Sequence, residues 1–141
     1  MNRKTRAQKD LILADKLVTE VAQKDGSVQK IYGGLCHSFP VLVRTCGLCQ
    51  ALAFSEAKSK AGEDAGRKEA HALLLRHVAG ILGMQEAATN ESPALEAVRD
   101  AGVTEYMLQT RRVLSAWIYF KRFAESRLKV ASAQDSQEGE R

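Results

Sequence analysis

The chain has 141 residues, of which 45% are apolar and 27% charged, and it carries a formal net charge of +4 at pH 7. No apolar run approaches the roughly 18 residues of a membrane span, and the basic N-terminus lacks the apolar block of a secretory signal. An odd number of cysteines, three, then favours a cytoplasmic protein with reduced thiols and no membrane partner. We expect one domain over residues 1–131 and a polar, disordered tail over residues 132–141.

The first half of the chain is predicted to form three helices. Apolar residues recur every three or four positions from Ala7 to Val21, which predicts a helix over about residues 4–24. A shorter helix is expected over about residues 28–37. Ser38 and Pro40 then suit the cap and first turn of a third helix that runs to about residue 59, because a first turn leaves its amide hydrogens unpaired.

Two further helices are indicated by their end signals. Acidic residues open a fourth helix over about residues 63–82, where they favour the positive end of the helix dipole, and Gly83 closes it. Residues 85–91 are predicted to be a polar loop. Ser92 and Pro93 form a cap and first turn, so a short helix should follow and end near residue 101.

The last helix is expected to begin with Thr104 as its cap and to reach about residue 130. It holds most of the aromatic residues, and apolar positions cover much of its circumference, so we expect it at the centre of the bundle. No strand-like alternation of useful length occurs. The predicted fold class is therefore all-α: a single compact bundle of about six helices with a long, apolar, aromatic-rich C-terminal helix.

The histidines do not form a catalytic constellation. His71 lies on the apolar face of the expected fourth helix, which favours a core or boundary position over a catalytic role. The sequence contains neither a phosphate-cradling glycine loop nor a nucleophile elbow. We therefore predict no catalytic residues, and the chain is not expected to be an enzyme.

The cysteines raise the question of a zinc site. Cys36, His37, Cys46 and Cys49 would formally supply a Cys₃His set, and the two-residue gap between the last two cysteines fits zinc. Packing is the favoured explanation, because Cys46 and Cys49 fall on one apolar face of the expected third helix and a second cysteine pair is missing. We predict no metal and no cofactor.

Basic residues form stripes on three of the expected helices. On the third helix Arg44 and Lys58 flank the small residues Gly47, Ala51 and Ser55, where a strand could approach closely. A single basic stripe is typical of any solvent-exposed helix face, but three such stripes favour binding to a phosphate backbone. Contacts of this kind depend little on the nucleic-acid sequence. The candidate contact residues are Arg44, Lys58, Arg6, Lys9, Lys16, Arg111, Arg122 and Lys129.

The segment from Tyr32 to Phe54 carries a resemblance to a known family. With its Phe39-Pro40 entry, Gly47-Leu48 and Ala51-Leu52-Ala53-Phe54 followed by Ser59-Lys60, it resembles the small helical subunit of the Cmr-type (type III-B) CRISPR RNA-guided effector complex. The resemblance extends over about residues 1–130, and Arg44 and Lys58 lie in its matched segment.

The resemblance implies a single helical domain without nuclease activity that serves antiviral defence. Several copies would stack beside the guide-bearing backbone subunits and contact the guide or target RNA. The implied partners are thus other subunits of the complex, guide and target RNA, and copies of the chain itself. A helical adaptor without RNA contacts and a DNA-binding regulator, with its turn at Ala101-Gly102-Val103, remain the alternatives.

Overall fold

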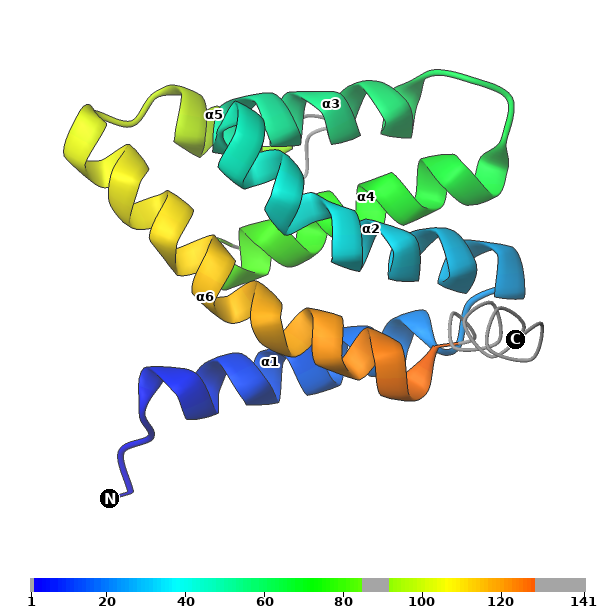
Figure 1. Ribbon diagram of the computed structural model, residues 1–141, viewed down its shortest axis with the longest axis horizontal. Coiled ribbons are helices and arrows are strands. Elements are labelled where there is room, and N and C mark those ends of the chain that lie inside the picture. Colours follow the sequence, from blue (N-terminus) through cyan, green and yellow to red (C-terminus); the bar gives the residue numbers. More distant parts are fainter. Residues whose placement is uncertain (1, 85–91, 129–141) are drawn as a thin grey trace, which may run out of the picture.

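A computed structural model describes residues 2–84 and 92–128, and in these ranges the chain forms six α-helices and no strand. This confirms the prediction of an all-α bundle of about six helices (Figure 1). The helices are α1 (Arg6–Val21), α2 (Gly26–Cys46), α3 (Leu48–Lys60), α4 (Ala65–Ile81), α5 (Pro93–Arg99) and α6 (Val103–Arg127). The predicted polar loop and tail lie outside the described residues. None of the helices in the described ranges combines the length and apolar character needed to cross a bilayer.

Three helices begin with side-chain caps that the sequence provides. Thr5 accepts a hydrogen bond from the Gln8 amide at 3.1 Å, and its own amide donates to the Gln8 side chain at 2.7 Å. Asp64 caps α4, and Ser92 caps α5 directly before Pro93. These contacts satisfy amide hydrogens that a helix start leaves unpaired, and the last of them confirms the predicted start of the fifth helix.

α2 continues through Pro40, so the prediction that a third helix begins at Ser38 is wrong. Proline has no amide hydrogen, and inside a helix it leaves the carbonyl four residues earlier without a donor. Here that carbonyl belongs to Cys36, and the indole Nε1–H of Trp117 donates to it at 3.0 Å. A side chain of α6 thus replaces the hydrogen bond that the proline removes.

The chain turns instead at Gly47, between α2 and α3. Its φ of +90° lies in the left-handed region that favours glycine. The hydroxyl of Tyr106, in the first turn of α6, accepts a hydrogen bond from the Cys49 amide at 3.2 Å. A Cβ atom at Gly47 would lie 3.0 Å from this hydroxyl, so the start of α6 packs directly on the junction.

The centre of the bundle is α4 rather than α6. Nine of the 17 residues of α4 are buried, and it packs against all the other helices. Only five of the 25 residues of α6 are buried, since α6 lies along one side of the bundle (Figure 1). The predicted central position of the last helix is therefore wrong. Its buried face carries Trp117, whose ring stacks on Phe120 at 4.8 Å and packs on Phe39 at 4.9 Å.

Candidate nucleic-acid interface

Two hydrogen bonds fix how α6 runs beside α2 and the start of α3. They join Trp117 to Cys36 and Tyr106 to Cys49. Residue numbers rise along α6 while they fall along its neighbour, so the two stretches are antiparallel. Positions equally far from these contacts therefore lie at about the same level.

With this register, two cations of α2 each lie beside a cation of α6, at about the same height along the two helices. Arg44 lies five residues before Cys49 and Arg111 five residues after Tyr106. From the other contact, Lys30 lies six residues before Cys36 and Arg122 five residues after Trp117, so these two are also at about the same level. All four are exposed. On a wheel of about 100° per residue they point outward from their helices together with two exposed aliphatic residues. We call this surface the α2–α6 face; it comprises Lys30, Val41, Arg44, Arg111, Ile118 and Arg122.

The cations of the α2–α6 face differ from other cations of the chain in having no ion pair with any residue of the described ranges. Lys24 pairs with Glu69 at 3.2 Å, Lys60 pairs with Glu56 at 3.1 Å, and Arg127 pairs with Asp15. A nearby acid of α6, Glu125, is 3.8 Å from the His37 ring. The positive charge of the α2–α6 face is therefore not compensated by these acids.

Lys30 was not among the sequence-predicted candidates. It falls on the same side of α2 as Arg44 only if the helix is continuous, because fourteen residues are close to four full turns. The predicted break at Ser38 concealed this relation. The signal was present in the sequence, but the helix boundary was misplaced.

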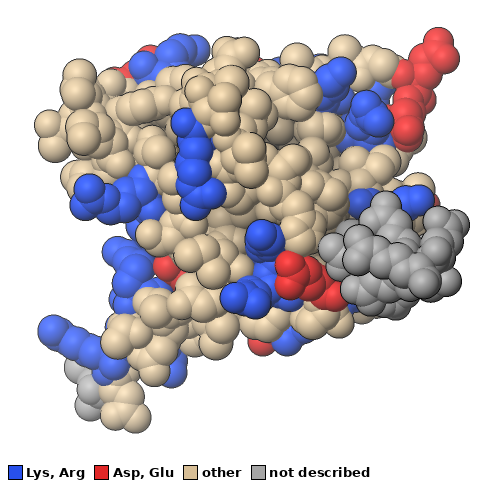
Figure 2. Space-filling view, viewed as in Figure 1, with Lys and Arg blue, Asp and Glu red and all other residues tan. Residues whose placement is uncertain are grey.

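The cations predicted for the first helix lie on α1. Arg6, Lys9 and Lys16 are all exposed. Figure 2 shows that basic side chains gather at the lower left, near the N-terminus, whereas acidic ones are prominent over the connection between α3 and α4. The apolar face is shifted from the predicted one: Ala7 and Leu11 are exposed, and the interior face begins with a buried acid at position 10.

The stripe predicted for the third helix does not exist as a surface. Ala51 and Ser55 are buried, and the Ser55 hydroxyl lies 3.2 Å from His71 Nδ1, so no strand can approach there. Arg44 is on α2, whereas Lys58 is near the far end of α3, where its ammonium lies 5.6 Å from the centre of the Phe54 ring. The structure thus does not bring Arg44 and Lys58 together. Lys129 lies outside the described residues.

Two of the histidines are enclosed in the core. His77 Nδ1 and the hydroxyl of Tyr32 share a hydrogen bond of 2.5 Å, and burial with the nearby Arg76 charge lowers the pKa of His77 to about 3. His71 is also buried, which confirms its predicted core or boundary position, and this burial lowers its pKa. Neutral, enclosed imidazoles of this kind are structural hydrogen-bond partners.

The cysteines do not share one helix face. Cys36 is buried, where desolvation raises the pKa of its thiol. Cys46 is exposed at the end of α2, and Cys49 is half-buried in the first turn of α3, so the predicted common apolar face is wrong. Across residues 2–84 and 92–128, no three side chains of the metal-binding types lie close enough together to hold an ion.

These features define a class: a small all-α bundle whose outward helix faces carry exposed cations that have no ion pair within the described ranges. The sequence profile described as CRISPR-associated protein (Cas_Cmr5) matches residues 6–127. The chain therefore belongs to the Cmr5 family of CRISPR-associated proteins.

Named relatives agree with this membership. The CRISPR system Cmr subunit Cmr5 of Thermus thermophilus is 36% identical over 123 residues, which span 87% of this chain and 96% of the relative. The crystal structure of a CRISPR-associated Cmr5 family protein from the same species superposes with a TM-score of 0.72 at 35% identity, covering 90% of this chain and all of that one. The resemblance seen in the sequence is confirmed.

Proposed function

We propose that the chain is a non-catalytic small subunit of a type III-B CRISPR ribonucleoprotein effector that works in the cytoplasm in antiviral defence. Several copies stack in the complex beside its guide-bearing subunits and contact the backbone of guide or target RNA. The observation that carries the RNA contact is the α2–α6 face, with two level pairs of exposed cations and no ion pair to a described acid.

The spacing of these cations suits a chain of phosphates. Eleven residues separate Arg111 from Arg122, which is about 16 Å along a helix and spans several successive phosphates. Between these cations lie Ser115 and Ile118, which carry no charge that would repel a backbone. Lysine and arginine on rigid helices gain affinity by releasing counterions, and such contacts position a strand without reading its bases.

The surface of α1 supports a second, weaker line of contact. Lys9 and Lys16 are exposed and have no ion pair to a described residue. Lys58 stays a candidate at the end of α3, separate from the α2–α6 face. The absence of catalysis is supported by the enclosure of His71 and His77, because a general base must reach its substrate.

The test is RNA binding by the purified chain at several salt concentrations. Replacing Arg44 and Arg111 together by alanine should weaken binding of single-stranded RNA at least tenfold. It should also reduce the slope of log affinity against log salt by about 1.4, at roughly 0.7 for each phosphate that is no longer neutralised. A matched double variant, Arg67→Ala with Lys68→Ala, removes the same charge from the start of α4 and should change binding little.

The outcomes separate the proposed function from its alternatives. Equal weakening by both double variants would show that only net charge matters and that the α2–α6 face is no site. Unchanged RNA binding in both would favour the adaptor, and tight, sequence-selective binding of duplex DNA would favour the regulator.

A further inference from the structure

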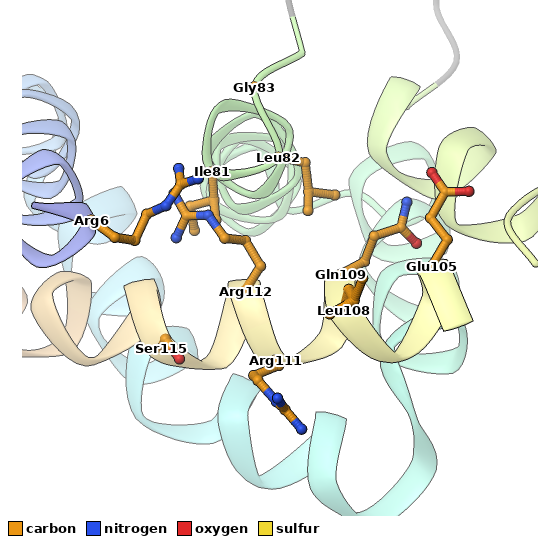
Figure 3. Close-up of a pocket in the computed structure, with 10 residues that line it drawn as sticks. All are labelled: Arg6, Ile81, Leu82, Gly83, Glu105, Leu108, Gln109, Arg111, Arg112 and Ser115. Carbon is orange, nitrogen blue, oxygen red and sulfur yellow. The ribbon is translucent and has the colours of Figure 1, made fainter. Parts of the chain in front are cut away.

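A hollow of about 520 Å³ lies where the start of α1, the end of α4 and the first turns of α6 meet (Figure 3). Ile81 and Leu82 of α4 and Leu108 of α6 give it apolar walls. Figure 3 shows Arg6 and Arg112 extending toward each other near Ile81, while Arg111 points away on the other side of α6. Arg111 and Ser115 also line the hollow, so the hollow borders the α2–α6 face at Arg111.

Arg6 and Arg112, which extend toward each other in the hollow, differ in charge compensation. Arg112 is held by the buried Asp10, with Nη2 2.7 Å from Oδ1 and Nη1 donating to Oδ2 at 3.0 Å. Arg6 has no ion pair with any residue of the described ranges. Beside the apolar walls, Arg6 thus offers a cation that no acid of the described ranges pairs with, which suits a carboxylate.

At the other end of the hollow a polar atom lacks a partner. The Oε1 atom of Gln109 is buried, yet no donor in the described part of the chain bonds to it. Figure 3 shows this side chain between Leu82 and Glu105. Because buried acceptors are nearly always paired in proteins, this amide suits an N–H group brought by a ligand.

The apolar surface extends from Leu108, at the hollow, over the first turns of α6. Val103, Met107 and Leu108 are 79%, 61% and 58% exposed. Aliphatic side chains and methionine exposed together are typical of a surface that a protein covers.

We propose that this hollow receives a segment of another protein subunit, with an apolar side chain against Leu108 and the α4 end. A neighbouring carboxylate of that segment pairs with Arg6, and an N–H group donates to Gln109. This proposal rests on the proposed role as a subunit of a larger complex, and adds to it a protein-docking surface that borders the RNA-binding one at Arg111.

The experiment co-expresses the tagged chain with the other subunits encoded by the same CRISPR system and measures how much complex is recovered. Leu108→Asn removes the apolar contact without adding charge, and Ile12→Asn does the same at a residue of α1 that is 51% exposed and outside the hollow. We expect at least tenfold less complex with Leu108→Asn and wild-type recovery with Ile12→Asn. Each isolated variant should bind RNA as the wild type does.

A second variant guards against loss through misfolding. Gln109→Leu removes the unpaired acceptor, so the isolated chain should melt at the same or a higher temperature while complex recovery falls. Wild-type recovery of complex with both Leu108→Asn and Gln109→Leu would overturn the docking surface and leave the proposed function standing. A wild-type chain that does not join the complex would overturn both.

Two other outcomes would assign the hollow to a different occupant and so overturn the proposal. Loss of RNA binding by isolated Leu108→Asn would make it part of the RNA site. A lower molecular mass in light scattering for isolated Leu108→Asn than for wild type would show that a second copy of the chain fills it.

Discussion

Replacing Trp117 by phenylalanine tests how the chain keeps a proline inside a long helix. The indole is fully buried and is the donor to the Cys36 carbonyl at 3.0 Å. Pro40 has no amide hydrogen with which to make this bond within the helix. Phenylalanine keeps an aromatic ring against Phe120 but removes the donor, so the carbonyl would be buried and unpaired.

The expected loss follows from these two changes. A buried acceptor without a partner costs about 1–3 kcal/mol, and the smaller ring leaves a void, so Trp117→Phe should lower the unfolding free energy by about 2–4 kcal/mol. Urea denaturation followed by far-ultraviolet circular dichroism measures this, provided that the slope with urea is unchanged.

A second substitution isolates the hydrogen bond. Pro40→Ala returns an amide hydrogen to α2 that can bond to the Cys36 carbonyl, so in this background Trp117→Phe should cost less by about 1 kcal/mol or more. An equal cost of Trp117→Phe in both backgrounds would refute the reasoning, because it would show that the indole acts by packing alone.

Two further outcomes follow from burial and backbone geometry. Folding lowers the pKa of His77 from 6.5 to about 3, so between these pH values the unfolded chain binds a proton at His77 that the folded chain does not. The free energy of unfolding should therefore fall as the pH is lowered from 6.5 toward 3, and His77 should contribute at most about 1.4 kcal/mol to this fall for each pH unit. His77→Asn should flatten that part of the stability curve; an unaltered slope would show that other groups cause it. Gly47→Ala should lower the free energy of unfolding, measured by urea denaturation, more than Gly62→Ala does. Both glycines have a positive φ, which costs a residue with a Cβ about 1–2 kcal/mol, but only at position 47 would the new Cβ also press against the Tyr106 hydroxyl. Equal losses of unfolding free energy would mean that the Tyr106 hydroxyl moves away from the new Cβ without cost.

Local signals in the sequence predicted most of the helix ends. Ser92 with Pro93 marked α5, Gly83 marked the end of α4, and the acids at 63 and 64 marked its start. Each of these signals acts within a few residues of the end that it defines. The all-α class and the number of helices follow from such signals together with apolar periodicity.

The errors arose where a distant contact overrides a local preference. From local preference, Pro40 indicates a helix start. It lies inside α2 because Trp117, 77 positions further along the chain, donates the hydrogen bond that the proline cannot make. Asp10 reads as a surface acid until Arg112 is placed beside it. The misplaced break in α2 then separated Lys30 from Arg44, so Lys30 was missed although its fourteen-residue spacing from Arg44 is present in the sequence.

The contacts of α6 also bear on the order in which the protein can form. Arg112, Trp117 and Tyr106 reach back to α1, α2 and α3, respectively. A ribosome makes those three helices first, so during translation Asp10 lacks its counterion and the Cys36 carbonyl lacks its donor. These three contacts can therefore form only after the final helix has left the exit tunnel, so the fold of the nascent chain is completed late.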